Sequence, residues 1–366
     1  DDGDNRKLVR VGDFAINSRS DRRGSCGISP LDGSVSLINI ILTPRTAMHP
    51  GYYNWLFHTT LFADEFYKWG HGIVADLWTT RWQEMKSITV PVPEYAEQER
   101  IAAFLNAECA EIDAVLEKTR ASIEEYKKLK QAVITQAVTK GIRGDRPMKN
   151  SGIEWIGDIP ESWEVSSVRY IGQLQNGISK GGEFFGKGFP FVSYGDVYKN
   201  YELPHSVSGL IDTTEDERAK YSVEYGDIFF TRTSETIEEV GFSCVCKRSI
   251  PNATFAGFII RLRPFCADEK ILTDYAKYYF RGEHIRAYLV KEMNLVTRAS
   301  LGQTLLKGMS VIVPPKSVQK EIAEYLDDKC ADIDALVAKK QQYLTEIENY
   351  KKSLIYEYVT GKKEVV

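Results

Sequence analysis

The sequence predicts two globular domains of mixed α+β structure (α/β class), joined by two long helices that form an antiparallel coiled coil. The whole chain forms an internal pseudo-two-fold repeat. Three observations support this. One stretch of the chain occurs twice. Each copy leads from a strand-like run ending in Val-Pro into a long charged helical pattern. The stretches before each copy mix short β-like runs with turns, which is typical of globular domains.

The duplicated stretch keeps a constant offset of 221 residues over about fifty positions, without a gap. Such a self-similarity is a structural repeat, and it makes two modules the natural unit of the chain. The offset relates Pro93 to Pro314, Cys109 to Cys330, Asp113 to Asp334, and Thr139 to Thr360.

We therefore divide the chain into four parts. Residues 1–95 form the first globular domain and 96–143 the first long helix. A linker and the second globular domain occupy 144–313, and the second long helix occupies 314–366. Gly141, Gly144 and Pro147 end the first helix.

The long helices carry an apolar seam whose spacing alternates between four and three residues. A helix of about 40 residues is roughly 60 Å long and cannot bury such a seam alone, so we expect the two helices to pair. Acidic residues dominate early in the first helix and basic residues late, which favours an antiparallel pair. The expected pairing residues are Leu105, Ile112, Leu116, Ile123 and Tyr126 in the first helix, and Leu326, Ile333, Val337, Leu344 and Ile347 in the second. Lys130 and Lys351 occupy the same late seam position.

The composition is that of a globular protein, because 43% of the 366 residues are hydrophobic and 27% are charged. No apolar run approaches the roughly 18 residues of a membrane span, and no leader opens the chain, so we expect a cytoplasmic protein. The formal net charge of -4 argues against a protein that coats nucleic acid indiscriminately, but it does not exclude a specific binder.

No metal site is expected, because the six cysteines form no Cys-x-x-Cys pair and the five histidines lie at no ligand spacing near them. Cys109 and Cys330 lie at equivalent positions inside the helical patterns, where a small buried thiol is the expected role.

Within the globular domains we expect strands at 37–43, 189–192, 227–231 and 255–262, and helices at 52–57 and 274–290. The two domains also echo each other: Gly12-Asp13 matches Gly226-Asp227. Nothing before residue 1 matches 151–213, so we expect the first domain to lack its N-terminal part of roughly 60 residues in this sequence. Either residues beyond this sequence supply that part, or another chain completes the domain.

The chain offers no reaction centre and no cofactor site. The segment 181–187 resembles the front of a phosphate-binding P-loop, but Gly188 stands where that motif needs Ser or Thr, and Phe189-Pro190 prevents an immediate helix. No Rossmann-type glycine pattern, methyltransferase tetrapeptide or nuclease-like acidic cluster is present. We therefore expect a non-catalytic protein.

What remains is a set of loops rich in side chains that bind nucleic acid. Taken singly, each loop is also compatible with ordinary surface, but their recurrence at comparable places in both modules favours DNA reading. The expected DNA-binding residues are Lys180, Lys187, Arg232, Thr233, Ser234, Arg298, Ser300 and Gln303 in the second module, and Arg19, Arg22, Arg23, Arg81 and Trp82 in the first.

The duplicated motif resembles the conserved regions of type I restriction-modification specificity subunits. It consists of a strand ending in Val-Pro, then Gln-x-x-Ile-Ala-x-x-Leu, then Ile-Asp-Ala. The segment 153–163 is similar to the start of that family's target-recognition domains, and 226–233 resembles their Gly-Asp strand segment. The motif residues are Gln98, Ile101, Ala102 and Leu105, and again Gln319, Ile322, Ala323 and Leu326.

The resemblance implies a non-catalytic subunit whose two target-recognition domains each read one half of a split site in double-stranded DNA. It also implies that the paired helices set the spacing and recruit two modification subunits, which bind S-adenosylmethionine and methylate adenine. Restriction subunits are further possible partners. Two alternatives remain open: a coiled-coil scaffold without DNA reading, and a self-contained DNA methyltransferase.

Overall fold

The computed structural model describes residues 5–19, 24–72, 78–144, 146–234, 240–293 and 299–365, and of residues 234 and 299 it describes the backbone alone. The chain forms two compact units. Unit 1 contains residues 1–124 and 338–366, and unit 2 contains residues 125–337. The division runs through both long helices, so each unit is a globular part with one half of each helix.

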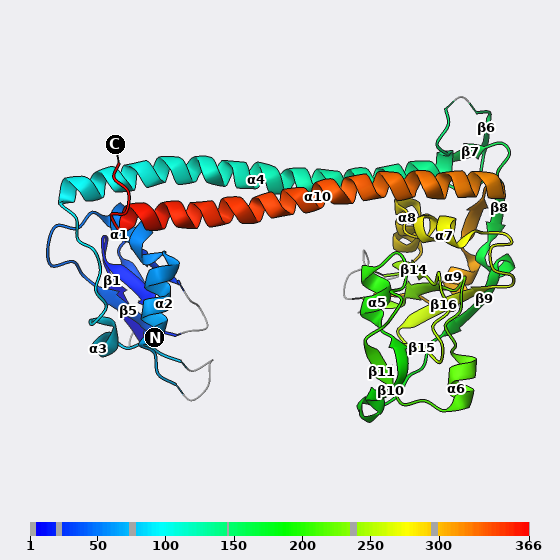
Figure 1. Cartoon of the computed structure of the whole chain (residues 1–366), viewed down its shortest axis with the longest axis horizontal. Coiled ribbons are helices and arrows are strands. Elements are labelled where there is room, and N and C mark those ends of the chain that lie inside the picture. Colours follow the sequence, from blue (N-terminus) through cyan, green and yellow to red (C-terminus); the bar gives the residue numbers. More distant parts are fainter. Residues whose placement is uncertain are drawn as a thin grey trace. The chain divides into compact units, whose positions relative to one another are not determined.

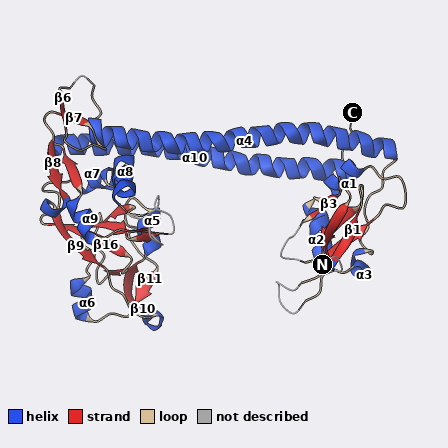
Figure 2. Cartoon of the chain, turned by 180° about the vertical axis from the view of Figure 1, so that it is seen from behind, coloured by secondary structure: helices blue, strands red, loops and turns tan. Residues whose placement is uncertain are grey.

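Unit 1 is built on a three-stranded antiparallel sheet of order β3-β2-β5, beside the antiparallel pair β1–β4. Helices α1 and α2 lie beside the strands (Figure 1, Figure 2), and their aromatic side chains fill the core with Phe14 and Ile16. The elements are β1 (Arg6–Val9), β2 (Phe14–Asn17), β3 (Cys26–Ile28), β4 (Gly33–Ser36), β5 (Asn39–Leu42), α1 (Pro50–Phe57), α2 (Thr60–Lys68) and α3 (Trp82–Met85).

Unit 2 contains a four-stranded sheet of order β14-β12-β16-β9 and a three-stranded sheet of order β11-β10-β15. Helices α7 and α8 lie between α10 and these sheets (Figure 1). The strands are β6 (Met148–Asn150), β7 (Asp158–Pro160), β8 (Glu164–Ser167), β9 (Gly172–Asn176), β10 (Phe185–Val192), β11 (Gly209–Ile211), β12 (Ile228–Thr231), β13 (Thr233–Ser234), β14 (Ser243–Val245), β15 (Thr254–Phe255), β16 (Ile259–Pro264), β17 (Ala299–Ser300) and β18 (Ser310–Val313). The helices are α5 (Tyr194–Lys199), α6 (Glu215–Lys220), α7 (Thr273–Tyr279), α8 (Glu283–Glu292), α9 (Gln303–Gly308) and α10 (Lys316–Val359), of which α10 continues into unit 1.

The central strands of the two units pair in the same register. In unit 1, Phe14 of β2 faces Leu42 of β5. At the matching positions of unit 2, Ile228 of β12 faces Leu262 of β16. On the other side of the central strand, β3 in unit 1 and β14 in unit 2 also pair antiparallel with it. The sequence similarity between the two globular parts therefore corresponds to a structural repeat.

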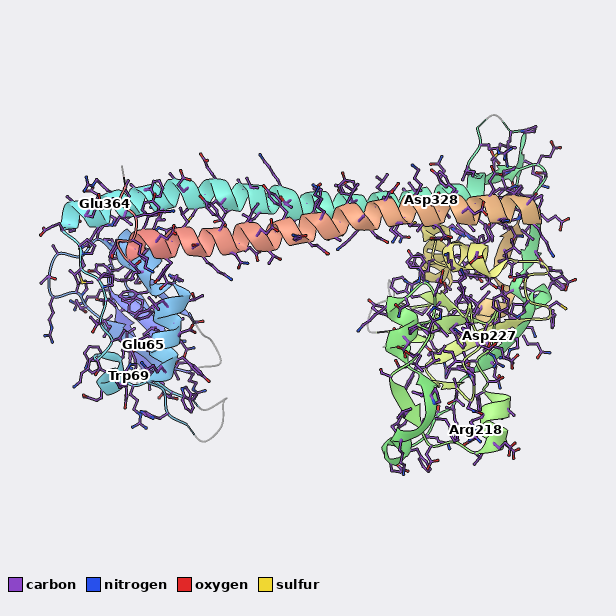
Figure 3. All side chains as sticks on the ribbon, in the orientation of Figure 1. Glu65, Trp69, Arg218, Asp227, Asp328 and Glu364 are labelled. Atoms are coloured by element: carbon purple, nitrogen blue, oxygen red, sulfur yellow. The ribbon has the colours of Figure 1, made fainter. Side chains whose placement is uncertain are left out.

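The Gly-Asp motif forms the turn that starts each central strand. Gly12 and Gly226 both have φ of 87°, a conformation that favours glycine. The carboxylate of Asp13 accepts from the Arg10 amide (2.8 Å) and from the Thr43 hydroxyl (2.7 Å), and these hydrogen bonds lower its pKa. Asp227 lies inside the globular part of unit 2 (Figure 3), where Arg263 donates to both of its carboxylate oxygens.

The two long helices, α4 (Tyr95–Lys140) and α10, are antiparallel in both units. Within unit 1, Lys351 pairs with Asp113 at 2.6 Å. The repeat-related pair in unit 2 is Lys130 with Asp334, also at 2.6 Å. Each seam lysine therefore binds the aspartate of the other helix's Ile-Asp-Ala motif, and the antiparallel coiled coil expected from the sequence is confirmed.

The residues of the expected seam differ in how deeply they are buried. Its buried members are Leu105, Leu116, Ile123, Leu326 and Ile333, and its half-buried members are Ile112, Tyr126, Val337, Leu344 and Ile347. Cys109 and Cys330 are buried, as expected for small seam residues. Both helix ends that carry the motif leucines also enter the cores of the globular parts.

A buried glutamine joins each long helix to its globular part. The Gln319 side-chain oxygen accepts from the Leu272 amide (2.7 Å), and its NH₂ group donates to the carbonyls of Lys270 (2.9 Å) and Pro314 (2.8 Å). In unit 1, Gln98 accepts from the His49 amide (2.8 Å) and donates to the Pro93 carbonyl (2.7 Å). The motif glutamine is therefore conserved between the repeats as a structural link.

Two expected elements of unit 2 are each divided. The strand expected at 255–262 was wrong as a single strand, because β15 pairs with β10 whereas β16 pairs with β12, and Gly257 lies in the turn between them. The helix expected at 274–290 is α7 followed by α8, because Gly282 is extended (φ -67°, ψ 154°) and caps α8. The aromatic stripe of α7 is core, as Tyr275 and Tyr279 are fully buried.

The segment that resembles a P-loop is a short 3-10 helix, Gly182–Phe184, followed directly by β10. No helix follows it, so the phosphate-binding geometry is absent there. Over the described ranges, no helix is long and apolar enough to cross a membrane.

We expect Gln319→Ala to lower the free energy of unfolding of unit 2 by about 1–3 kcal/mol, because it removes the partner of the Leu272 amide, of the Lys270 carbonyl and of the buried Pro314 carbonyl. Denaturant unfolding measures this. Lys329→Ala, at an exposed position of the same helix within unit 2, is the matched control and should stay within about 0.5 kcal/mol of the parent. Equal effects of the two substitutions would show that the link contributes nothing.

We expect His284 to make unit 2 less stable in acid. Burial lowers its imidazole pKa from 6.5 to about 3, and neither ring nitrogen has a hydrogen-bond partner among the described residues. Below about pH 6.5 the unfolded chain takes up a proton at His284 that the folded chain does not. The contribution of His284 to the free energy of unfolding is therefore fully present above that pH and decreases as the pH falls. Denaturant unfolding at about pH 7 and about pH 4.5 should show a smaller loss for His284→Phe than for the parent. An identical loss would exclude this role.

Candidate nucleic-acid interface

A two-stranded antiparallel ribbon in unit 2 brings together loops that lie far apart in the sequence. The ribbon consists of β13 and β17, with Thr233 facing Ser300. Strand β13 follows the central strand β12 after the single residue Arg232. Ser300 is exposed and Thr233 is half-buried. The sequence singled out both loops, and the structure makes them neighbours.

The backbone of Arg232 fixes the base of this ribbon. Its amide donates to the Phe258 carbonyl (2.9 Å), and its carbonyl accepts from the Leu301 amide (2.7 Å). Leu301 is fully buried, so the ribbon is tied to the core immediately after β17. Arg232 itself is half-buried, and the turn residue beside it, Phe258, has 63% of its surface exposed.

Gln303, the first residue of α9, adds a third loop to the group. Its NH₂ donates to the side-chain oxygen of Asn176 (2.9 Å), which ends β9. Both residues are half-buried. The amide groups therefore connect the end of the edge strand to the segment that follows the ribbon, and they place two amide side chains next to its polar loops.

Unit 1 repeats this arrangement. Arg19 forms an antiparallel bridge with Thr79, and the Thr80 amide donates to the Ser18 carbonyl (2.9 Å). Arg19 follows the central strand β2 as Thr233 follows β12, so the two bridges occupy equivalent positions. Arg19 is exposed.

Two further expected residues of unit 1 come directly after this bridge. Arg81 is exposed and precedes α3, whose first residue, Trp82, has 45% of its surface exposed. At the offset of 221 residues, Trp82 corresponds to Gln303. The start of α3 therefore presents an aromatic ring where the start of α9 presents an amide.

The two expected lysines of unit 2 have different surroundings. Lys180 is half-buried, and its ammonium binds the Glu217 carboxylate (2.6 Å) and the Asp212 carbonyl (2.9 Å). The hydrogen bond from Lys180 lowers the pKa of Glu217. Lys187 is exposed on β10. The Lys180 side chain therefore holds the segment after β9 against α6, whereas Lys187 projects into solvent.

Some expected residues fall outside the part of the chain that the structure describes. These are Arg22, Arg23 and Arg298, together with the side chain of Ser234. Within the described ranges, no group of three or more His, Cys, Asp or Glu is arranged to hold a metal ion.

Phe258 and Asn176 were not among the DNA-binding residues expected from the sequence. Phe258 lies in an apolar run that reads as a single buried strand, so its exposure depends on the division of that run into β15 and β16. Asn176 ends β9 shortly before the expected Lys180, but no sequence signal indicates its contact with Gln303.

The polar and charged groups of these ribbons suit nucleic acid. Arginine can bind guanine or phosphate, amides can bind adenine, and hydroxyls bind either bases or phosphates. A two-stranded ribbon has dimensions that the DNA major groove admits. Each unit thus carries one such group at the end of its central strand.

The comparisons with known proteins agree on one family. Residues 160–348, which are more than half of the chain, match the type I restriction modification DNA specificity domain. The chain is similar to the StySPI specificity subunit of Salmonella potsdam and the EcoKI specificity subunit of Escherichia coli K12, each with 24% identity over 75% of the chain. It spans 58% of the length of each of these two relatives.

The fold is similar to solved structures of the same kind. One, from a study of complex assembly and conformational transition of the type I R-M system, matches 98% of this chain and 84% of its own chain, with a TM-score of 0.76 and 15% identity. The HsdS subunit of Thermoanaerobacter tengcongensis matches 98% of this chain and 83% of its own, with a TM-score of 0.51 and 16% identity. At these identities the likeness concerns the fold.

We expect Lys180→Met to lower the unfolding midpoint of unit 2, because it removes the partner of Glu217 and a hydrogen bond to the Asp212 carbonyl. Lys187→Met, which removes the same charge from an exposed position, should leave the midpoint unchanged. Thermal unfolding of both variants measures the difference. A larger loss for Lys187→Met would contradict the structural role of Lys180.

Proposed function

Because the chain belongs to the type I restriction-modification DNA specificity domain family, we propose that it is the DNA sequence-recognition subunit of such a complex. The single observation that carries the proposal is the recurrence of one backbone pairing: Thr233 with Ser300 in the ribbon of unit 2, and Arg19 with Thr79 as a single bridge in unit 1. Two equivalent readers in one chain suit a bipartite site in double-stranded DNA.

Base reading is assigned to the side chains on and beside the ribbons. In unit 2 these are Arg232, Thr233, Ser300 and Gln303, with Lys187 suited to a phosphate. The tie between the Arg232 carbonyl and buried Leu301 supports this assignment, because a rigid base limits how the ribbon's side chains can move. In unit 1 the corresponding side chains are Arg19, Arg81 and Trp82.

The long helices are assigned the spacing and assembly roles. Half-site spacing is a geometric property of a DNA-binding protein, and helices continuous from one unit into the other suit a spacer. We further propose that the helices recruit two modification subunits, which bind S-adenosylmethionine and methylate adenine, and that restriction subunits join the same cytoplasmic complex. This chain itself acts without catalysis and without a cofactor.

We expect Arg232→Ala to weaken binding to the recognised duplex by about 1–3 kcal/mol if the guanidinium contacts a base edge. The recognised duplex is first selected from a random library with the parent chain assembled with its modification subunits. Affinities of parent and variant are then compared at one fixed salt concentration, since salt alone changes such affinities strongly.

Arg248→Ala is the matched control for this substitution. Arg248 is exposed and lies beyond β14, at the end of the sheet opposite the ribbon. It should therefore leave specific binding unchanged. Equal affinities of parent and Arg232→Ala would refute the assignment of Arg232. Failure to select any duplex would instead favour a coiled-coil scaffold, and methyl transfer by the chain alone would favour a methyltransferase.

A further inference from the structure

An exposed aromatic side chain lies among the polar groups to which base reading is assigned. Phe258, in the turn between β15 and β16, has 63% of its surface exposed, whereas Ile259 and Ile260 directly after it are fully buried. The Arg232 amide donates to the Phe258 carbonyl (2.9 Å), so the ring is attached to the backbone beside this arginine. A single exposed apolar residue is ordinary on a protein surface. The position of Phe258, next to a candidate base-reading arginine, is what sets it apart.

The turn that carries Phe258 is held from both sides, because β16 lies between β12 and β9. On the side of β12, the hydrogen bond from Arg232 holds it. On the side of β9, the Gly177 amide donates to the Ile259 carbonyl (3.2 Å). A Cβ atom at Gly177 would lie 2.2 Å from the Ala256 carbonyl oxygen, so the two backbones are in direct contact there. A backbone fixed in this way limits where the ring can reach.

Unit 1 places an apolar residue at the equivalent position. There the Ser18 amide, directly after β2, donates to the carbonyl of Ile38 (3.1 Å), directly before β5. In unit 2, Arg232 and Phe258 form the same pair between the end of β12 and the start of β16. Ile38 is half-buried, and Leu37 before it has 47% of its surface exposed. An apolar residue beside the start of the reading loop therefore recurs in both units.

The chemistry of the DNA major groove suits an apolar ring at this position. A two-stranded ribbon fits that groove, and the apolar group that base edges present there is the C5-methyl group of thymine. Phenylalanine is one of the side chains that contact this methyl group. The polar groups of Arg232, Thr233 and Ser300 can bind the hydrogen-bonding atoms of neighbouring bases, and the ring of Phe258 adds apolar surface next to them.

Insertion between base pairs is the other role that DNA-binding proteins give to an exposed aromatic ring. Such rings enter from the minor groove and kink the duplex. The guanidinium and hydroxyl groups beside Phe258 favour the major groove, because there each base pair presents a distinct pattern of donors and acceptors for them to read. A contact with a base edge therefore suits this ring better than insertion does.

We propose that Phe258 reads thymine by contacting the C5-methyl group of one thymine in the half-site bound by unit 2. The contact removes the methyl group and part of the ring from water, and it disfavours cytosine at that position, since cytosine lacks the methyl group. The inference rests on the proposed DNA-reading function and adds to it the base that this residue recognises.

The test removes the methyl group from one thymine at a time. The duplex is the one selected with the parent chain assembled with its modification subunits. Each thymine in it is replaced in turn by deoxyuridine, which lacks only the methyl group and still pairs with adenine. At one position we expect the affinity of the parent complex to fall about threefold to fivefold, the effect of leaving one methyl group uncovered. The same replacement should leave the affinity of the Phe258→Ala complex unchanged, with all affinities measured at one salt concentration.

Phe265→Ala is the matched control. Phe265 directly follows β16 at its opposite end and has 60% of its surface exposed, so this variant loses an equally exposed ring away from the ribbon. It should keep the sensitivity of the parent to the methyl group. Phe258→Leu retains an apolar side chain and should keep part of that sensitivity. Both alanine substitutions are at exposed positions, so both variants should fold as the parent does.

The remaining outcomes overturn the proposal. Equal sensitivity of the parent and Phe258→Ala to the same thymine assigns the methyl contact to another side chain. A selected duplex in which no thymine replacement changes the affinity overturns this inference alone, even if Phe258→Ala weakens binding to every duplex. Failure to select any duplex overturns the proposed function itself, and the two failures are thus distinguishable.

Discussion

The buried motif glutamine is the contact on which the architecture depends. The Gln319 side-chain amide forms hydrogen bonds with three backbone groups of unit 2. Gln98 makes the equivalent link in unit 1 with two hydrogen bonds. A side chain that is both buried and fully hydrogen-bonded fixes the start of a helix relative to the adjoining loops, because any shift would leave polar groups without partners. The globular part and its half of the long helices therefore behave as one body in each unit.

This constraint explains how a duplicated sequence gives duplicated geometry. The Gly-Asp turn starts each central strand, the register of that strand with its neighbour is the same in both units, and the strand then leads into the bridge or ribbon. Side chains such as Arg19 and Thr233 can differ between the units while their backbone positions stay equivalent. Such a scaffold lets the reading side chains vary without altering the fold.

Much of this was predictable from the sequence, because periodicity and the constant offset report on the backbone. The long helices, their antiparallel pairing and the strand near Ile228 follow from local patterns, whereas the strand at Phe14–Asn17 was not expected from the sequence. The division of 274–290 at Gly282 was missed because aromatic spacing continues across it. The engagement of Lys180 by Glu217 and the exposure of Phe258 depend on contacts between distant segments, which no local pattern reports.

We propose that each of the two equivalent units reads its own half of one DNA site. Hydroxyl-radical footprinting of the selected duplex, bound to the chain assembled with its modification subunits, tests it most directly. We expect two protected tracts separated by a less protected spacer, with protection of one tract weakened when Arg232 and Thr233 are both replaced by alanine. A single continuous tract, or equal weakening of both tracts by that double substitution, would contradict it.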